Sequence, residues 1–117
     1  MNAFFKSFVY AFKGIRLSLL ERNTRVHFFC ALLVVLAGFF FSISATEWSI
    51  LLLCMGIVIS LEIINTAIEQ LVNLVSPHYH ELAGKVKDLA AGAVLLFSII
   101  SAIIGVLIFW KYLVLIF

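Results

Sequence analysis

Residues 60–77 read SLEIINTAIEQLVNLVSP, a stretch with the apolar content of a membrane helix that also carries two glutamates and two asparagines. On a helical wheel, its polar side chains fall within a sector of about 100°. They are Glu62, Asn65, Thr66, Glu69, Asn73 and Ser76. A charged side chain that faces hydrocarbon costs about 3 kcal/mol or more. This polar stripe must therefore face protein or water.

The composition of the whole chain points to a membrane protein. Of 117 residues, 65% are hydrophobic and 12% are charged, whereas soluble domains carry about 25% charged residues. So short a chain cannot bury this much apolar surface by itself, and a single membrane-embedded domain over 1–117 is expected. The net charge of +2 does not suggest a nucleic-acid partner. The charged N-terminal region has no small-residue cleavage site, which argues against a removable signal peptide.

Three apolar segments are long enough, or nearly so, to cross a bilayer as helices, which takes roughly 20 residues. They are about 26–43, 48–75 and 89–110. Pro77 cannot continue the second helix, and the third is expected to begin near Glu81 after a tight turn. Cys30 and Cys54 lie in these apolar runs without metal-binding spacing and are expected to be buried thiols. The predicted fold class is all-α and integral to the membrane.

Residues 2–20 have the pattern of an amphipathic helix. One face holds Phe4, Phe5, Phe8, Phe12, Ile15 and Leu19. The opposite face holds Asn2, Lys6 and Lys13, with Arg16 at its margin. A basic amphipathic helix suits the surface of an anionic membrane. A helix packed against protein is the alternative interpretation.

Positive charge is distributed unevenly between the connections. The region before residue 26 contains five Lys or Arg residues, the connection 76–88 contains Lys85 and Lys87, and residues 44–47 contain none. By the positive-inside rule, the N-terminus and the 76–88 connection are expected in the cytoplasm and the C-terminus outside.

The two glutamates of the stripe lie at different depths. Glu69 is near the cytoplasmic end, and Glu62 is seven residues further in, roughly 10 Å along the helix axis. Other polar residues are expected at the same cytoplasmic edge, namely Glu21, Asn73, His78, His80, Lys87 and Asp88. Carboxylates suit Mg²⁺, which binds one or two of them together with substrate phosphates, and a lysine suits a phosphate as a point charge.

Spacing alone leaves three readings of this edge open. Intramembrane polar residues form hydrogen-bond networks that fix oligomers, serve in ion or proton pathways, or build a site for chemistry. The sequence contains neither a Walker A motif nor a kinase glycine-rich loop. The segment 28–41 has no ionisable side chain besides Cys30, which disfavours a conduction pathway through all three spans.

Four motifs carry a resemblance to a known family. They are EIINTAIEQLVN (62–73), YHELAGKVKDLAAGAVLL (79–96), YAFKGIR (10–16) and ERNTRVH (21–27). In order and spacing they resemble the prokaryotic diacylglycerol kinase family over about residues 6–98. One departure is Val86, where the family usually has alanine before the lysine.

The resemblance implies a small kinase of the bacterial cytoplasmic membrane that works as a homotrimer with active sites between subunits. It implies transfer of the γ-phosphate of ATP to a lipid hydroxyl with Mg²⁺, on the cytoplasmic side. An alternative of a different class stays open beside the resemblance, namely a non-enzymatic small membrane subunit or an ion- or proton-conducting oligomer.

The resemblance also assigns roles to individual positions. Glu62 matches the general base, and Glu21 and Glu69 match the metal-binding carboxylates. The implied nucleotide-binding positions are Tyr10, Glu21, Glu69, His78, Tyr79, His80, Lys87 and Asp88. The implied lipid-side positions are Lys13, Asn65 and Ala91. His27 and Ala91 resemble the undecaprenol-type members, and diacylglycerol is the second candidate substrate.

Overall fold

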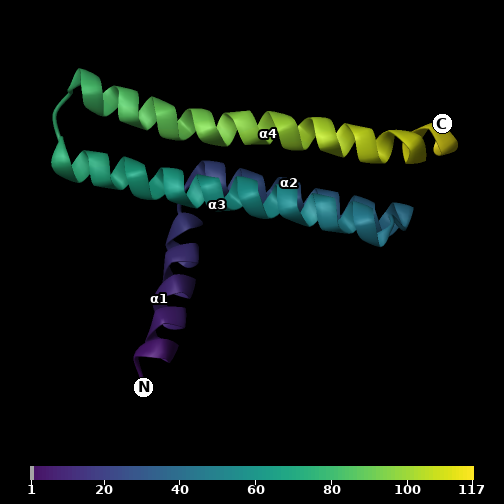
Figure 1. Ribbon diagram of the computed structural model, residues 1–117, viewed down its shortest axis with the longest axis horizontal. Coiled ribbons are helices and arrows are strands. Elements are labelled where there is room, and N and C mark those ends of the chain that lie inside the picture. The colour runs from purple at the N-terminus through teal and green to yellow at the C-terminus, as the bar shows by residue number, and fades with distance from the viewer. Residues whose placement is uncertain (1) are drawn as a thin grey trace.

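The structure, a computed structural model, describes residues 2–117 as four helices joined by short turns. They are α1 (Ala3–Ser18), α2 (Arg22–Phe41), α3 (Ala45–Val75) and α4 (Glu81–Ile116). Residue 1, the first position of the expected 1–117 domain, lies outside the described part. The long helices α3 and α4 run antiparallel, α2 lies along α3, and α1 leaves the bundle at a steep angle (Figure 1). Within residues 2–117 there is no strand, which confirms the all-α prediction.

Three helices are long and apolar enough to cross a membrane, and they differ in length. α2 has 20 residues, α3 has 31 and α4 has 36. At 1.5 Å per residue these helices are about 30, 46 and 54 Å long, against a hydrocarbon core of about 30 Å. α3 and α4 are therefore longer than the hydrocarbon core is thick. The shorter α2 lies along the N-terminal part of α3 (Figure 1).

α1 lies across the direction of the three long helices (Figure 1). Asn2 caps it by accepting a hydrogen bond of 3.0 Å from the backbone N–H of Phe5. Every residue of α1 except Ser18 is exposed, the phenylalanines included. A helix with an exposed apolar face that lies across the membrane-length helices fits the predicted position in the membrane interface, which stays a prediction.

The turn between α2 and α3 is set by local hydrogen bonds. Ser42 has a left-handed backbone with φ 51°. The Ser44 hydroxyl then accepts from the Glu47 N–H at 3.1 Å, and Glu47 Oε1 accepts from the Ser44 N–H at 3.0 Å. This capping box starts α3 at Ala45, three residues before the predicted span at 48.

The apolar core of the bundle lies next to this turn. Ile43, Leu51 and Ile108 are buried there, and the aromatic rings of Phe41 and Tyr112 pack against them. Partly buried residues Val34, Trp48, Met55, Ile104 and Phe109 complete the cluster. The hydrophobic packing of this chain is therefore concentrated at the end of the bundle where α3 begins and α4 ends.

The expectation of two buried thiols was wrong for one cysteine. Cys54 is buried, but Cys30 is exposed. Cys30 lies in the middle of α2, a helix that packs mainly along α3. An apolar run in a membrane protein does not imply burial against protein, because lipid covers exposed apolar faces equally well.

Candidate active site

The polar stripe of α3 changes from buried to exposed along its length. Glu62 is 4% exposed, Asn65 is 5% exposed and Thr66 is 8% exposed. Glu69 is half-buried and Asn73 is exposed. The prediction that the stripe faces protein or water is confirmed for its buried part. The gradient also separates the two glutamates into an enclosed one and a more accessible one.

A groove of about 300 Å³ opens between α2, α3 and α4. α3 supplies Glu62, Asn65 and Glu69; α2 supplies Asn23, Val26 and His27; and α4 supplies Ala91, Val94, Leu95 and Ser98. One wall is thus carboxylate and amide, and the α4 wall is small or apolar. A molecule with a polar head and an apolar body matches a groove of this kind.

Glu62 meets His27 across the groove. Glu62 Oε2 lies 3.6 Å from His27 Nε2, and the two side chains are 5% and 23% exposed. This separation exceeds a direct hydrogen bond, so the contact is electrostatic in character. A buried carboxylate held in this way can accept a proton from a ligand in the groove.

Asn65 lies between the two glutamates of the stripe and is hydrogen-bonded to the more accessible one, Glu69. Its Nδ2 donates to Glu69 Oε1 at 3.3 Å. Its Oδ1 is buried and has no hydrogen-bond partner among residues 2–117. A buried acceptor without a partner costs about 1–3 kcal/mol. The unpaired Oδ1 therefore offers a place for a donor, such as a hydroxyl group, of a bound molecule.

One turn beyond Glu69, a residue of the polar stripe is hydrogen-bonded to α4. Lys87 Nζ donates a hydrogen bond of 2.6 Å to Asn73 Oδ1. The turn between the helices is held by Ser76 Oγ, which donates to the His78 carbonyl at 3.1 Å. His80 then caps α4 by accepting from the Leu82 N–H through Nδ1 at 3.1 Å. α4 begins at Glu81, as predicted.

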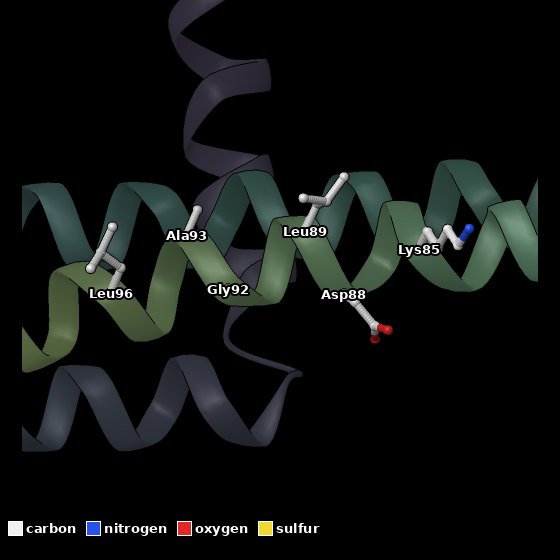
Figure 2. Close-up of a pocket in the computed structure, with 6 residues that line it drawn as sticks. All are labelled: Lys85, Asp88, Leu89, Gly92, Ala93 and Leu96. Atoms are coloured by element: carbon white, nitrogen blue, oxygen red, sulfur yellow. The ribbon is translucent and has the colours of Figure 1, made fainter.

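Lys87 and Asp88 do not share a groove in this chain. Asp88 lies in a separate shallow hollow of about 640 Å³ on the outer side of α4. Lys85, Leu89, Gly92, Ala93 and Leu96 complete that hollow. Figure 2 shows Asp88 directed away from Leu89 and Ala93. Neighbouring residues on a helix point about 100° apart, so a single chain does not bring Lys87 and Asp88 into one groove. Their shared role at one site stays a prediction.

The remaining predicted positions lie outside the groove. Tyr10 and Lys13 are exposed on α1, Glu21 is the exposed residue that precedes α2, and His78 and Tyr79 are exposed on the turn after α3. Of the predicted lipid-side residues, Asn65 and Ala91 line the groove. A single chain therefore gathers the predicted base, Glu62, and one predicted metal-binding carboxylate, Glu69, while most of the predicted nucleotide-binding residues lie outside the groove.

The groove supplies some, but not all, of the ligands that a magnesium ion needs. Among residues 2–117, no three His, Cys, Asp or Glu side chains come together as metal ligands. Glu69 nevertheless presents an accessible carboxylate beside the Asn65 amide. Mg²⁺ usually takes one or two carboxylates and completes its shell with water and substrate phosphates. Glu69 fits that mode of binding, and an all-protein cage does not.

Several groove residues were missed from the sequence. Asn23 and Val26 form one face of α2 with His27, and Val94, Leu95 and Ser98 follow Ala91 at helical spacing. Extending the i, i+3, i+4 and i+7 pattern from Ala91 would have found the three α4 residues, and Asn23 lies one helical turn before His27. Thr24 was also missed. It is 0% exposed, and its hydroxyl has no partner among the described residues.

The family pattern and the related proteins that match this chain point to the same family. The sequence pattern of the prokaryotic diacylglycerol kinase family matches residues 9–109. The undecaprenol kinase of Bacillus subtilis is 48% identical over 110 residues, covering 93% of this chain and 89% of that protein. The diacylglycerol kinase of Synechocystis is 42% identical over 101 residues, covering 85% and 58%. The diacylglycerol kinase of Escherichia coli K12 is 31% identical over 104 residues, covering 88% and 85%.

Proposed function

The chain belongs to the prokaryotic diacylglycerol kinase family and is a lipid kinase, and we propose that it transfers the γ-phosphate of ATP to the hydroxyl of a membrane lipid alcohol. The observation that carries this proposal is the groove, which has a buried carboxylate, Glu62, opposite the apolar face of α4. The family does not favour the alternative of a non-enzymatic subunit or an ion-conducting oligomer.

Glu62 is the proposed general base. The lipid oxygen forms a bond to the γ-phosphorus, and its proton passes to the Glu62 carboxylate. The bond between the γ-phosphorus and the bridging oxygen breaks, and its electron pair leaves with ADP. Phosphoryl transfer depends mainly on positioning and charge stabilisation, and a positioned base adds about 10²–10⁴-fold.

The donor nucleotide is proposed to bind at the more accessible end of the stripe. Glu69 and Glu21 are the proposed carboxylates for Mg²⁺, which when bound would offset charge on the phosphates. Lys87 would pair with a phosphate oxygen as a point charge. The other proposed nucleotide contacts are Tyr10, His78, Tyr79, His80 and Asp88. Lys13 is proposed on the lipid side with Asn65 and Ala91.

A homotrimer would complete this site. Tyr10, Glu21 and Asp88 lie outside the groove of their own chain. Neighbouring subunits are proposed to bring such residues to the groove at the subunit boundary. Exposed apolar side chains along α2 and α4, such as Leu36 and Leu107, offer surface for subunit contacts as well as for lipid.

Undecaprenol is the proposed lipid, with diacylglycerol as the second candidate. The Bacillus subtilis relative, named an undecaprenol kinase, shares 48% of residues with this chain over nearly its whole length. His27 and Ala91, both groove residues, are the positions at which the sequence resembles undecaprenol-type members. The N-terminus and the groove are proposed to face the cytoplasm of a bacterial cell, with the C-terminus outside.

Purified protein incubated with γ-labelled ATP, Mg²⁺ and each lipid in mixed micelles tests the function. The expected result is a labelled lipid phosphate, with the higher kcat/KM for undecaprenol. Omitting Mg²⁺ should remove the product. Labelling of neither lipid would contradict the kinase function, and a higher kcat/KM for diacylglycerol would reverse the substrate assignment alone.

A further inference from the structure

Glu62, the base of the proposed reaction, is enclosed, and it takes up one proton in each turnover. Its side chain is 5% exposed. The residues that precede it on the same face of α3, namely Val58, Cys54 and Leu51, are buried and apolar. A carboxyl group that keeps its proton cannot act as a base in the next turnover. The proton therefore needs a path from Glu62 to water.

The groove around Glu62 offers few groups that could carry this proton. Among its lining residues in the described part of the chain, the ionisable ones are Glu62, Glu69 and His27. The α4 wall has no charged side chain, and its hydroxyl group, Ser98 Oγ, already donates to the Val94 carbonyl at 2.7 Å. The candidates for exchanging a proton with Glu62 are therefore Glu69 on α3 and His27 on α2.

Glu69 is separated from Glu62 by an amide that does not titrate. Asn65 lies between the two glutamates on the polar face of α3, and its Nδ2 donates to Glu69 Oε1 at 3.3 Å. An amide side chain donates and accepts hydrogen bonds but has no ionisable proton near neutral pH. Proton transfer from Glu62 along α3 is therefore disfavoured.

His27 has the position and the chemistry that such a transfer needs. Its Nε2 lies 3.6 Å from Glu62 Oε2, and its side chain is 23% exposed against 5% for Glu62. A small movement, or one bridging water molecule, brings the two atoms into hydrogen-bond contact. Imidazole gains and loses a proton between about pH 5 and 8. Arg25, a charged neighbour on α2, is turned away to the carbonyls of Leu19 and Leu20 at 3.2 and 3.3 Å.

We propose that His27 is a proton-relay residue, which takes the proton from Glu62 after phosphoryl transfer and releases it to water at the open side of the groove. This inference rests on the proposed kinase function. The O–H bond of the Glu62 carboxyl group breaks and an N–H bond forms at His27 Nε2, so the carboxylate is restored and the imidazole becomes imidazolium. The imidazolium then gives one proton to water and is neutral again. His27 acts through Glu62 and not on the phosphorus.

The first turnover and the later turnovers should respond differently to the loss of His27. Glu62 starts the first turnover as a carboxylate, so the single-turnover rate of lipid phosphorylation in His27→Gln should stay within about twofold of wild type. Steady-state kcat should fall about tenfold, because water alone must then remove the proton. Phe29→Leu, at an exposed position two residues further along α2, is the matched control and should change neither rate.

Added imidazole gives a second, independent readout. His27→Ala removes the ring, and imidazole in the buffer should restore its steady-state kcat. The restored fraction should be larger at about pH 8 than at about pH 6, because only neutral imidazole accepts a proton. All measurements use the full-length protein in mixed micelles, at a temperature below the Tm of every variant.

The outcomes distinguish this inference from the kinase function. Equal losses of the single-turnover rate and of steady-state kcat in His27→Gln would overturn the relay, because a residue that only holds Glu62 in place affects both. An unchanged kcat in both His27 variants, or a loss in His27→Ala that imidazole does not restore, would also overturn it. In these cases the kinase function stands. Wild-type protein that labels neither lipid would overturn both.

Discussion

Two carboxylates of α3, one near its start and one in its second half, differ in how completely their oxygens are paired. Near its start, Glu47 accepts hydrogen bonds from the Tyr112 hydroxyl at 2.6 Å and the Ser44 N–H at 3.0 Å, and its other oxygen meets Lys111 Nζ at 2.9 Å. In its second half, Glu62 has only a 3.6 Å electrostatic contact with His27, and the neighbouring Asn65 Oδ1 is unpaired within residues 2–117. A fully paired carboxylate stabilises the fold. An incompletely paired one retains bonding capacity for a ligand.

The largest expected effect is at the ligand-binding end. Glu69→Gln should raise the Mg²⁺ concentration needed for half-maximal activity about 100-fold, because a carboxylate ligand becomes a neutral amide. Activity measured against Mg²⁺ at fixed ATP checks this. Glu81→Gln, at an exposed glutamate of α4, is the control. An unchanged Mg²⁺ requirement in Glu69→Gln would remove this residue from metal binding.

At the other end, Glu47→Ala should reduce the free energy of unfolding, since hydrogen bonds to a charged group are lost and Tyr112 loses its acceptor. Thermal unfolding in detergent measures this as a lower Tm. The kcat of the folded fraction should stay at the wild-type value. A large loss of kcat without a change in Tm would mean that Glu47 takes part in function.

A smaller effect is expected from packing beside the same turn. A Cβ atom added at Gly38 would lie 2.5 Å from the Trp48 ring, while one added at Gly56 would meet no atom within 4 Å. Gly38→Ala should therefore destabilise the chain by about 1–2 kcal/mol through overpacking. Gly56→Ala, compared by the same unfolding experiment, should be neutral. Equal Tm values for the two variants would mean that the ring moves away at little cost.

Much of the fold could be predicted from the lengths of the apolar segments and from the position of Pro77. Three apolar runs predicted three membrane-length helices, and Pro77 predicted the end of α3. α3 begins three residues before the predicted span of about 48–75, because the S-x-x-E pattern of residues 44–47 forms a capping box. α4 also extends past Trp110 to Ile116, since the residues after Lys111 remain good helix formers in lipid.

The site could be predicted less completely, for a geometric reason. The helical wheel predicted the stripe because all its members lie on one helix. The groove also needs His27 and Ala91 from two further helices, and a single-helix pattern does not say which faces of these helices meet. Within one chain, helical geometry directs the adjacent residues Lys87 and Asp88 to different surfaces. Their predicted place at one nucleotide site stays a prediction.

Single-turnover phosphorylation of lipid tests the central claim most directly. Wild type, Glu62→Gln and Glu47→Gln would be compared with saturating ATP and Mg²⁺, at a temperature where all three proteins are folded. Glu62→Gln should be slower by about 100-fold or more because the base is lost, with ATP affinity unchanged, and Glu47→Gln should match wild type. A wild-type rate in Glu62→Gln, or an equal loss in both variants, would contradict the assignment of this groove as the active site.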